Sequence, residues 1–315
     1  MTIRSAAITG GTGMLAQALE QRLAEDGVAV TLIVNPASGR LGQMETSPAT
    51  KIVPCGLEDL ASLPAEQMGR CDAFYHFGWA GTFGPARDDA PLQSSNIRHT
   101  LEAVALAARL GCGVFVGAGS HAEYGRVDGL LTAATPTKPE TAYGIAKLAA
   151  GQLSRIACQQ RGLRHVWARV LSVYGPGDNP QTMMMSWINA LLRGERMAFT
   201  AGEQRWDYLY CDDAAQAFYQ MSKHGRDGAV YPLAGGQPRS LRQYILAARD
   251  TLNLAMEVGL GELPYPPGQV MHLEADVSQL TRDTGFAPAV SFEEGVRRTA
   301  NWLENKTRSN MHEDH

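Results

Sequence analysis

The sequence predicts an α/β fold, with a doubly wound parallel sheet and a smaller region interleaved in the C-terminal half. Three observations support this. A strand, a glycine-rich turn, a helix and a second strand follow one another within the first 35 residues. Strands and helices then alternate to residue 171, and this alternation is typical of parallel sheets. The pattern changes after residue 174, where GPGDNP and later ELPYPPG occur. We therefore predict a Rossmann-type domain over 1–173 and 207–234, a second domain over 174–206 and 235–303, and a flexible tail over 304–315.

The individual elements follow from apolar spacing. Strands are predicted at 6–9, 28–34, 71–77, 114–117 and 165–171 because each is a short apolar run. Helices are predicted at 14–26, 91–110 and 142–160. In the first of these helices, Leu15, Leu19 and Leu23 form one apolar stripe, and Gly27 stands where a helix often ends.

Composition excludes several classes of protein. The chain has 315 residues, of which 44% are hydrophobic and 19% charged, values typical of a globular protein and not of a disordered one. The 28 Lys and Arg against 32 Asp and Glu give a net charge of −4, and the absence of a basic run argues against a nucleic-acid partner. Five scattered cysteines and eight histidines without ligand spacing predict neither disulfides nor a metal site. With no apolar run of membrane-spanning length, we expect a cytoplasmic protein without a membrane partner.

The segment TGGTGMLA has the spacing of a dinucleotide-binding turn. Gly10, Gly13 and Ala16 lie between the first strand and the first helix, where glycine lets the backbone approach a pyrophosphate at the helix N-terminus. We predict that this turn binds a dinucleotide. The predicted cofactor-binding residues are Gly10, Thr12, Gly13, Met14, Leu15, Asn35, Ser38, Arg40, Leu57, Phe77, Gly78 and Lys147.

The end of the second strand indicates which dinucleotide is bound. NAD sites usually carry Asp or Glu there, but this chain has Asn35, followed by Ser38 and Arg40. A hydroxyl and a guanidinium suit the 2′-phosphate of NADP, so NADPH is the preferred cofactor. The alternative is that Ser38 and Arg40 belong to an ordinary solvated loop, and NADH and NAD stay open as cofactors.

A catalytic constellation is predicted from three residues. Tyr143 and Lys147 are four apart on a predicted helix and so share one face. A nearby ammonium lowers the pKa of a tyrosine, which favours proton exchange with a substrate oxygen. Ser120 follows a predicted strand, at the edge of the sheet where ligands bind.

With these motifs in place, the chain resembles the extended short-chain dehydrogenase/reductases that act on nucleotide sugars. The resemblance runs from TGGTG through YGIAK, RVLSVYGPGDNP and WDYLYCDDAAQAF to DVSQL and GFAP. It implies that Tyr143 is the general acid, that Lys147 holds the nicotinamide ribose, and that Ser120 hydrogen-bonds the reacting oxygen. It also implies that the second domain binds the nucleotide sugar, that Asn96 has a structural role, and that helices 91–110 and 142–160 form a homodimer interface.

Departures from the family pattern narrow the predicted reaction. The 4,6-dehydratases carry an Asp-Glu pair where this chain has His121 and Ala122, so dehydration lacks its acid and base. The GDP-fucose-forming type uses a Cys and a His as proton shuttles, and no Cys stands at the matching position after Ser120. A 4-epimerase and a 4-ketoreductase remain. Asn35 and Arg40 favour the reductase, and GSHAEYG, HFGWAG and QRWDYLY resemble motifs of 4-keto-6-deoxyhexose reductases such as CDP-abequose synthase.

The predicted function is therefore NADPH-dependent reduction of the C4 ketone of a nucleotide-linked 4-keto-6-deoxy sugar. The alternatives are an NAD-dependent 4-epimerase and, more remotely, a non-catalytic dinucleotide sensor. Packing is an equally good explanation for Trp79, and Met184 is more typical of a core residue. The predicted substrate-binding residues are Trp79, Thr82, Ser120, Tyr143, Ser172, Met184 and Arg205.

Overall fold

A parallel sheet of seven strands forms the centre of the protein. The computed structural model describes residues 1–313, and side-chain surroundings through residue 308. The strand order is β11-β6-β5-β4-β1-β2-β3, and each neighbouring pair is parallel, which confirms the predicted fold class. In order along the chain, the strands are β1 Ser5–Thr9, β2 Ala29–Val34, β3 Lys51–Pro54, β4 Ala73–His76, β5 Val114–Ser120, β6 Arg164–Val170 and β11 Ala229–Leu233.

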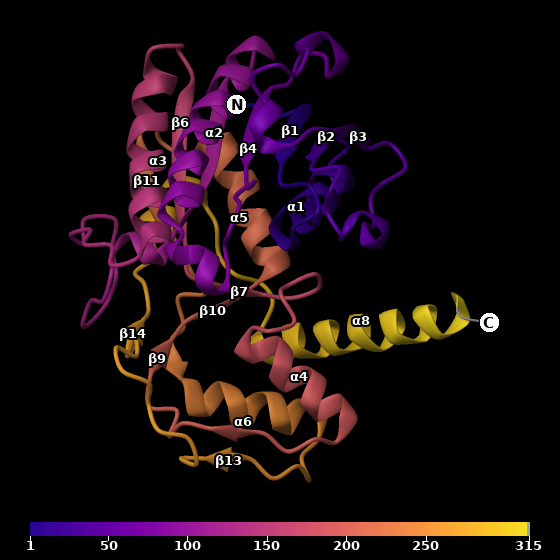
Figure 1. Cartoon of the computed structure of the whole chain (residues 1–315), viewed down its shortest axis with the longest axis vertical. Helices are drawn as coiled ribbons and strands as arrows, with labels where there is room; N and C mark the ends of the chain where they lie inside the picture. The colour runs from indigo at the N-terminus through magenta and orange to yellow at the C-terminus, as the bar shows by residue number, and fades with distance from the viewer. Residues whose placement is uncertain (314–315) are drawn as a thin grey trace.

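Helices cover both faces of this sheet (Figure 1). On one face, α1 (Met14–Glu25) packs beside α5 (Cys211–His224), and on the other α2 (Ala90–Arg109) packs beside α3 (Ala142–Gln159). Successive side chains of a strand point to opposite faces, so Ile8 lies in the core under α1 while Ala7 lies in the core under α2. The helices thus bury both faces of the strands, as a parallel sheet requires.

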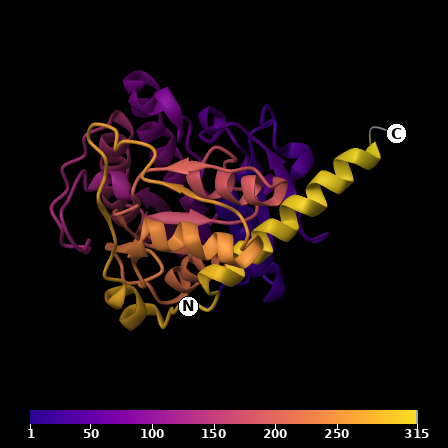
Figure 2. The same cartoon turned by 90° about the horizontal axis from the view of Figure 1, so that it is seen from below.

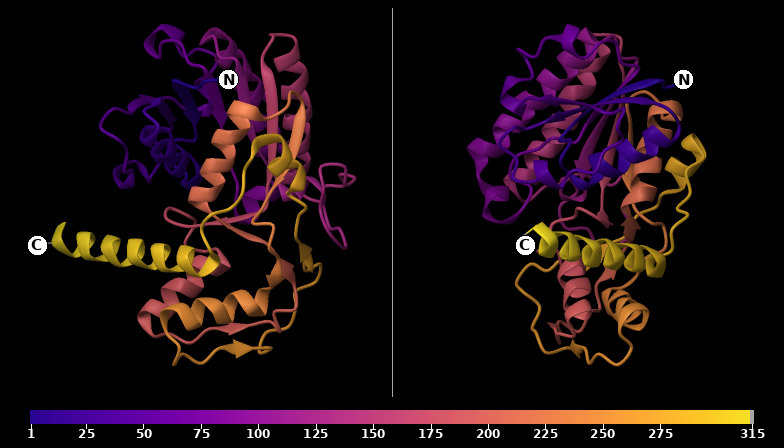
Figure 3. Two further views of the ribbon diagram at one scale, coloured as in Figure 1. Left: turned by 180° about the vertical axis from the view of Figure 1, so that it is seen from behind. Right: turned by 90° about the vertical axis from the view of Figure 1, so that its right-hand side faces the viewer.

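The second region lies beyond the carboxyl ends of the strands, and the chain enters it twice (Figures 1 and 3). Its helices are α4 (Met183–Arg193) and α6 (Leu241–Leu252). Three small sheets join its segments: β7 Ser172–Tyr174 with β10 Tyr208–Tyr210, β8 Ala198–Phe199 with β13 Gly259–Leu260, and β9 Arg205–Trp206 between β12 Arg239–Ser240 and β14 His272–Leu273. The following helix, α7 (Ser278–Thr284), packs on α5 and β11 of the main layer.

The last helix, α8 (Phe292–Glu313), starts against α4 and α6 and then projects away from the rest of the chain (Figure 2). Lys306 on this helix donates a hydrogen bond to Oε1 of Gln43. Residues 304–313 are therefore helical where the sequence predicts a flexible tail, and residues 314 and 315 lie outside the described part of the chain.

The structure corrects the expected end of β5 and adds short helices in several connections. Strand β5 continues to Ser120, three residues past its predicted end at 117, so the serine is the last residue of the strand. Short 3-10 helices occupy several connections: Leu41–Gln43, Leu57–Asp59, Ala65–Gln67, Gly84–Asp88 (η4) and His121–Glu123 (η5). None of the helices in the described residues has the length and apolar character needed to cross a membrane.

Candidate functional site

The glycine turn between β1 and α1 is shaped for close backbone approach. Gly10 has a φ of 72°, and a Cβ at this position would lie 2.7 Å from the backbone nitrogen of Gly78. Gly13 is the N-cap of α1 and brings no side chain to the helix end. The first N–H groups of α1 therefore have no side-chain cap, an arrangement that suits a phosphate.

A cavity of about 270 Å³ lies beside this turn. Its wall contains six residues that the sequence predicts as cofactor contacts and one, Trp79, that it predicts as a substrate contact. The lining residues are Gly10, Thr12, Ile33, Asn35, Ser38, Cys55, Leu57, Glu58, Gly78, Trp79, Ala80 and His99. The glycine turn and this wall fit a dinucleotide: the turn offers backbone N–H groups, and the cavity lies at the carboxyl ends of β1, β2 and β4.

The other predicted cofactor-binding residues do not line this cavity. Met14 and Arg40 line a neighbouring cavity of about 350 Å³, together with Thr12, Asp178 and Lys306. Leu15 packs against the hydrophobic core, and the Phe77 ring packs on Phe218 with centroids 4.6 Å apart. The side chains of Leu15 and Phe77 thus support the fold and line neither of these two cavities.

A side-chain hydrogen bond joins the loop after β2 to the glycine turn. The side chain of Asn35 accepts a hydrogen bond from the Ala37 backbone nitrogen at 2.9 Å. The hydroxyls of Ser38 and Thr12 are 3.1 Å apart, and the Arg40 nitrogen donates to the Ser38 hydroxyl at 3.3 Å. The loop therefore holds a hydroxyl and an exposed guanidinium near the turn, with no carboxylate at residues 35–40.

Ser120, Tyr143 and Lys147 come together at the carboxyl end of the sheet. Helix α3 starts at Ala142 and is capped by the Thr141 side chain, so Tyr143 stands in its first turn and Lys147 one turn later. The start of α3 packs tightly on η5. A Cβ on Gly144 would lie only 2.4 Å from the Ala122 carbonyl oxygen, so this close approach requires glycine. This packing brings the Tyr143 side chain within hydrogen-bonding reach of Ser120.

Burial dominates the electrostatics of this centre. It raises the pKa of Tyr143 above its ordinary value, against the smaller lowering effects of the Ser120 hydrogen bond and of Arg87. Burial also lowers the pKa of Lys147 to about 7, against the opposing field of Glu123. The Lys147 Nζ donates to the Ala118 carbonyl at 2.7 Å and lies 5.8 Å from the Tyr143 ring centroid. Burial thus outweighs the nearby charges at Tyr143, so the net change in its pKa is upward, and the predicted lowering effect of Lys147 stays a prediction.

Trp79 lines the cavity beside the glycine turn and also contacts two of the predicted catalytic residues. Its ring centroid is 3.7 Å from the Lys147 Nζ, and the ring meets that of Tyr143 edge-on with centroids 6.0 Å apart. Its Nε1 donates to Oε1 of Gln93 at 2.8 Å, which fixes the ring. The Trp79 ring is therefore held in contact with Tyr143 at the edge of the cavity.

Four of the predicted substrate-binding residues do not line the cavity beside the glycine turn. Thr82 is exposed in the loop after β4, and Ser172 lies at the start of β7. Met184 is 1% exposed and packs in the core with Trp187, so its side chain has no access to a substrate. The Arg205 side chain pairs with Glu274 at 3.3 Å and donates to the Pro238 carbonyl, so its guanidinium already has partners.

Three residues that sequence reasoning did not select lie at the site. The Arg87 guanidinium is 4.3 Å from the centroid of the Tyr143 ring. Both ring nitrogens of His99 are buried without a hydrogen-bond partner at the wall of the cofactor cavity. Glu123 is buried just after Ser120 and caps η5. Only Glu123 has a local signal, since Ser120 and Glu123 have the S-x-x-E spacing of a capping box.

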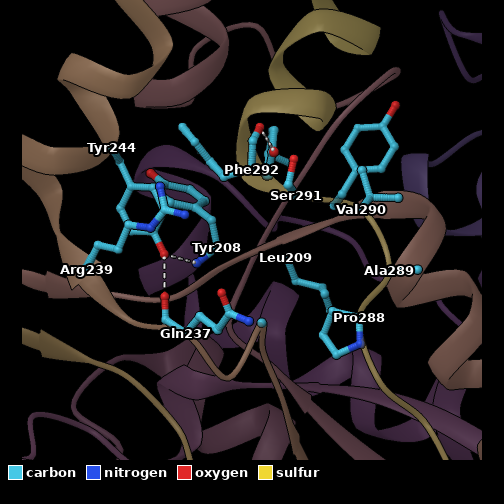
Figure 4. A pocket seen from close by; sticks show the side chains of 13 residues that line it. Tyr208, Leu209, Gln237, Arg239, Tyr244, Pro288, Ala289, Val290, Ser291 and Phe292 are labelled. Carbon is cyan, nitrogen blue, oxygen red and sulfur yellow. Dashed lines mark hydrogen bonds between the residues drawn. The ribbon is translucent and has the colours of Figure 1, made fainter. Parts of the chain in front are cut away.

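A separate cavity of about 220 Å³ lies between the second region and the start of α8 (Figure 4). Aromatic rings of Tyr208, Tyr244 and Phe292 pack around it, and Arg239 reaches its edge, where it pairs with Glu293. None of the residues predicted for cofactor or substrate binding lines this cavity. It is therefore distinct from the centre formed by Ser120, Tyr143 and Lys147.

Comparison with known proteins agrees with this geometry. The model of the NAD dependent epimerase/dehydratase family matches residues 6–234, which is most of the chain and includes the glycine turn and all three catalytic candidates. The chain belongs to this family. Within the epimerase/dehydratase family, a dTDP-glucose 4,6-dehydratase from Neisseria gonorrhoeae is 30% identical over 193 residues, covering 58% of this chain and 56% of the relative. The chain thus spans about half the length of that relative.

Solved structures share the fold over nearly the whole chain. A UDP-glucose 4-epimerase from Thermotoga maritima with UDP-glucose has a TM-score of 0.85 at 22% identity, covering 96% of this chain and 99% of its own. A dTDP-glucose 4,6-dehydratase from Streptomyces venezuelae with NAD bound has a TM-score of 0.81 at 22% identity, covering 96% of this chain and 97% of its own. These likenesses establish the fold of this family member.

Proposed function

We propose that the protein reduces the C4 ketone of a nucleotide-linked 4-keto-6-deoxy sugar, with NADPH as the hydride donor. The observation that carries the proposal is the meeting of Ser120, Tyr143 and Lys147 beside the dinucleotide cavity, with no free carboxylate next to Ser120. The names of related proteins, which act on dTDP-glucose and UDP-glucose, support a nucleotide sugar as the substrate class.

The surroundings of Ser120 support reduction over dehydration. His121 and Ala122 stand where the dehydratases carry their Asp-Glu pair. The next carboxylate, Glu123, is 1% exposed, and its Oε2 accepts from the Nε of Arg169 at 2.7 Å. Because this carboxylate is buried and paired, it is not available to exchange protons with C5 or C6 of a sugar. Burial also lowers the pKa of His121 to about 4, so its imidazole is neutral near pH 7.

The chemistry assigned to the side chains follows from their positions. A bound reduced nicotinamide supplies the hydride that reaches C4. Tyr143 gives the phenolic proton to the oxygen at C4, so that the carbonyl becomes an alcohol. Ser120 hydrogen-bonds the same oxygen and keeps it near the phenol. Lys147 holds the nicotinamide ribose, while Trp79 closes the wall behind it and limits the access of water.

The loop after β2 supports NADPH as the preferred cofactor. An acidic residue that would repel a 2′-phosphate is missing at Asn35. The Ser38 hydroxyl and the exposed Arg40 side chain offer a hydrogen bond and a positive charge near the glycine turn. Lys306 of α8 lies on the same neighbouring cavity as Arg40 and adds a second positive charge.

Cofactor consumption tests the proposal. The purified protein is mixed with NADPH or NADH and a panel of CDP-, dTDP- and GDP-linked 4-keto-6-deoxy sugars, and absorbance of the reduced nicotinamide is followed. We expect stoichiometric oxidation of NADPH with one member of the panel. Retained NAD together with C4 inversion of an ordinary UDP-sugar, observed by NMR, would instead establish the 4-epimerase alternative.

We also propose a homodimer formed through α2 and α3. Three apolar side chains of α3 face solvent in the single chain: Ile145 is 55% exposed, Leu153 42% and Ile156 44%. Apolar side chains that share one exposed helix face usually pack against a partner. The catalytic residues Tyr143 and Lys147 stand on the same helix, so dimer formation would hold that helix in place.

A further inference from the structure

His99 is a buried polar residue at the wall of the cofactor cavity. It stands on α2, is 7% exposed, and lines the cavity of about 270 Å³ beside the glycine turn. Within the described residues, neither nitrogen of its ring has a hydrogen-bond partner. A neutral imidazole carries one donor and one acceptor, and leaving both unpaired inside a protein is unfavourable. A polar ligand in the cavity would supply the missing partners.

The carboxylate of Glu58 borders the same cavity. Glu58 belongs to the 3-10 helix Leu57–Asp59, which follows β3 and contacts α2, the helix that carries His99. A Cβ on Gly56 would lie 2.6 Å from the Oε1 of Glu58, so the carboxylate lies in space that a side chain at residue 56 would occupy. Neighbouring elements thus bring a carboxylate and an unpaired imidazole to one cavity.

Apolar side chains form much of the remaining wall. Ile33, Cys55, Leu57 and Ala80 all line the cavity. The Leu57 side chain has room there because a Cβ on Gly78 would lie 2.6 Å from its Cδ2. Apolar walls with a small number of polar groups are typical of sites that bind a flat heterocycle. This part of the cavity therefore suits an aromatic base.

The strand order places these residues relative to the rest of a dinucleotide. The glycine turn after β1 suits the diphosphate, and residues after β2, such as Asn35, suit the adenosine ribose. Strand β3 lies beyond β2 at the edge of the sheet, so Glu58 lies farther from the turn than the ribose position does. A carboxylate repels phosphate and accepts from an amine, and the 6-amino group of adenine is a donor.

We propose that Glu58 and His99 recognise the adenine base of the cofactor: Glu58 accepts a hydrogen bond from the 6-amino group, and the His99 imidazole pairs with a ring nitrogen. The inference rests on the dinucleotide binding in the proposed function, but not on the reaction or on the sugar. It makes Glu58 a specificity-determining residue, because a base with a carbonyl oxygen at C6 would present an acceptor to the carboxylate.

A base analogue of the cofactor tests this assignment. In the hypoxanthine analogue of NADPH, a carbonyl oxygen replaces the 6-amino group and N1 carries a proton. Dissociation constants of NADPH and this analogue are measured at pH 7.5 from the fluorescence of the reduced nicotinamide, for the wild-type protein and for Glu58→Gln. Asp59→Asn is the matched control, because it removes the same charge from the same exposed 3-10 helix while Asp59 does not line the cavity.

We expect the analogue to bind the wild-type protein about tenfold more weakly than NADPH or worse, since two acceptors replace a charge-assisted hydrogen bond. In Glu58→Gln the two cofactors should bind within about threefold of each other, because the amide can also donate. Asp59→Asn should keep the wild-type ratio. Equal binding of both cofactors to the wild-type protein, an unchanged ratio in Glu58→Gln, or the same loss in Asp59→Asn would overturn the role of Glu58.

A second set of variants tests His99. His99→Phe keeps a flat ring and removes both nitrogens, so it should unfold at the wild-type temperature or above, since no hydrogen bond of the free protein is lost. It should bind NADPH about tenfold more weakly, and His99→Gln, which keeps a donor and an acceptor, should recover part of the loss. Wild-type affinity in His99→Phe would overturn the role of His99. If that variant fails to fold, His99→Leu makes the same test with a smaller side chain.

The binding measurements separate this inference from the proposed function. The same comparison is made with NADH and its hypoxanthine analogue. Absence of turnover with every keto-sugar, or a preference for NADH over NADPH, would refute the proposed function and leave the ratios between base analogues unchanged. A protein that binds none of the four dinucleotides would overturn both.

Discussion

Replacing Lys147 with methionine should stabilise the protein at pH 7.5 while it abolishes activity. The Lys147 side chain is 4% exposed, and burial lowers its pKa from 10.5 to about 7. At 1.36 kcal/mol for each tenfold change, this difference corresponds to about 5 kcal/mol by which folding disfavours the charged form. Methionine has a similar length, is apolar and carries no charge to bury, so Lys147→Met removes this cost.

The sign of the pH dependence follows from proton binding. Between pH 7 and 10.5 the unfolded chain keeps the Lys147 proton and the folded protein has released it, so the stability of the wild-type protein rises with pH. In Lys147→Met the titrating amine is missing, so residue 147 no longer makes the free energy of unfolding depend on pH. The stability advantage of the variant should therefore narrow by about 1.4 kcal/mol for each pH unit between pH 7.5 and 9.5. Loss of the hydrogen bond to the Ala118 carbonyl costs the variant about 1–3 kcal/mol in that range, an offset independent of pH.

Equilibrium unfolding in urea at pH 7.5, 8.5 and 9.5 measures the difference, with fluorescence and circular dichroism as separate probes. Lys138→Met is the matched control, because it makes the same substitution at an exposed lysine. The control should show a difference from wild type that is independent of pH. A constant difference for Lys147→Met as well would refute the argument, since it would mean that Lys147 does not change its protonation on folding in this range.

Three other predictions follow from the site and the exposed helix face. Tyr143→Phe should lower turnover about 10²- to 10⁴-fold with a nearly unchanged dissociation constant for NADPH, because only the proton donor is lost; near-normal turnover would remove Tyr143 from its role. Arg40→Ala should weaken NADPH about tenfold or more and NADH little, and equal losses for both would show that Arg40 does not contact the 2′-phosphate. Leu153→Asp should convert the proposed dimer to a monomer in sedimentation at micromolar concentration, whereas a wild-type monomer would contradict the dimer itself.

The sequence determined the fold class and the approximate place of the catalytic candidates. Short apolar runs that alternate with amphipathic helices have few solutions other than a parallel sheet, and the structure has the predicted strands within a few residues. The glycine turn was predictable because its function depends on local backbone geometry. The pairing of Tyr143 with Lys147 was also predictable from the sequence, since a spacing of four residues places side chains on one helix face.

Only the tertiary structure decided the electrostatics of the site. The sequence predicts that Lys147 lowers the pKa of Tyr143, yet burial raises it, because desolvation depends on the neighbours that folding brings together. Arg87 reaches the Tyr143 ring from η4, more than fifty residues away in the sequence, and no local pattern indicates such a contact. Lys306 contacts Gln43, beyond β2, for the same reason, from the last part of α8, which the sequence predicts as a flexible tail.

For Glu123, one contact was predictable from the local sequence and the others were decided by the tertiary structure. Its spacing from Ser120 is that of a capping box, a signal present in the sequence itself. Its link to Trp167 and Arg169 exists only because strands β5 and β6 are neighbours in the sheet. Local spacing thus specifies a hydrogen bond within one turn, while the pairing of distant strands decides whether a buried charge finds the partners that it needs.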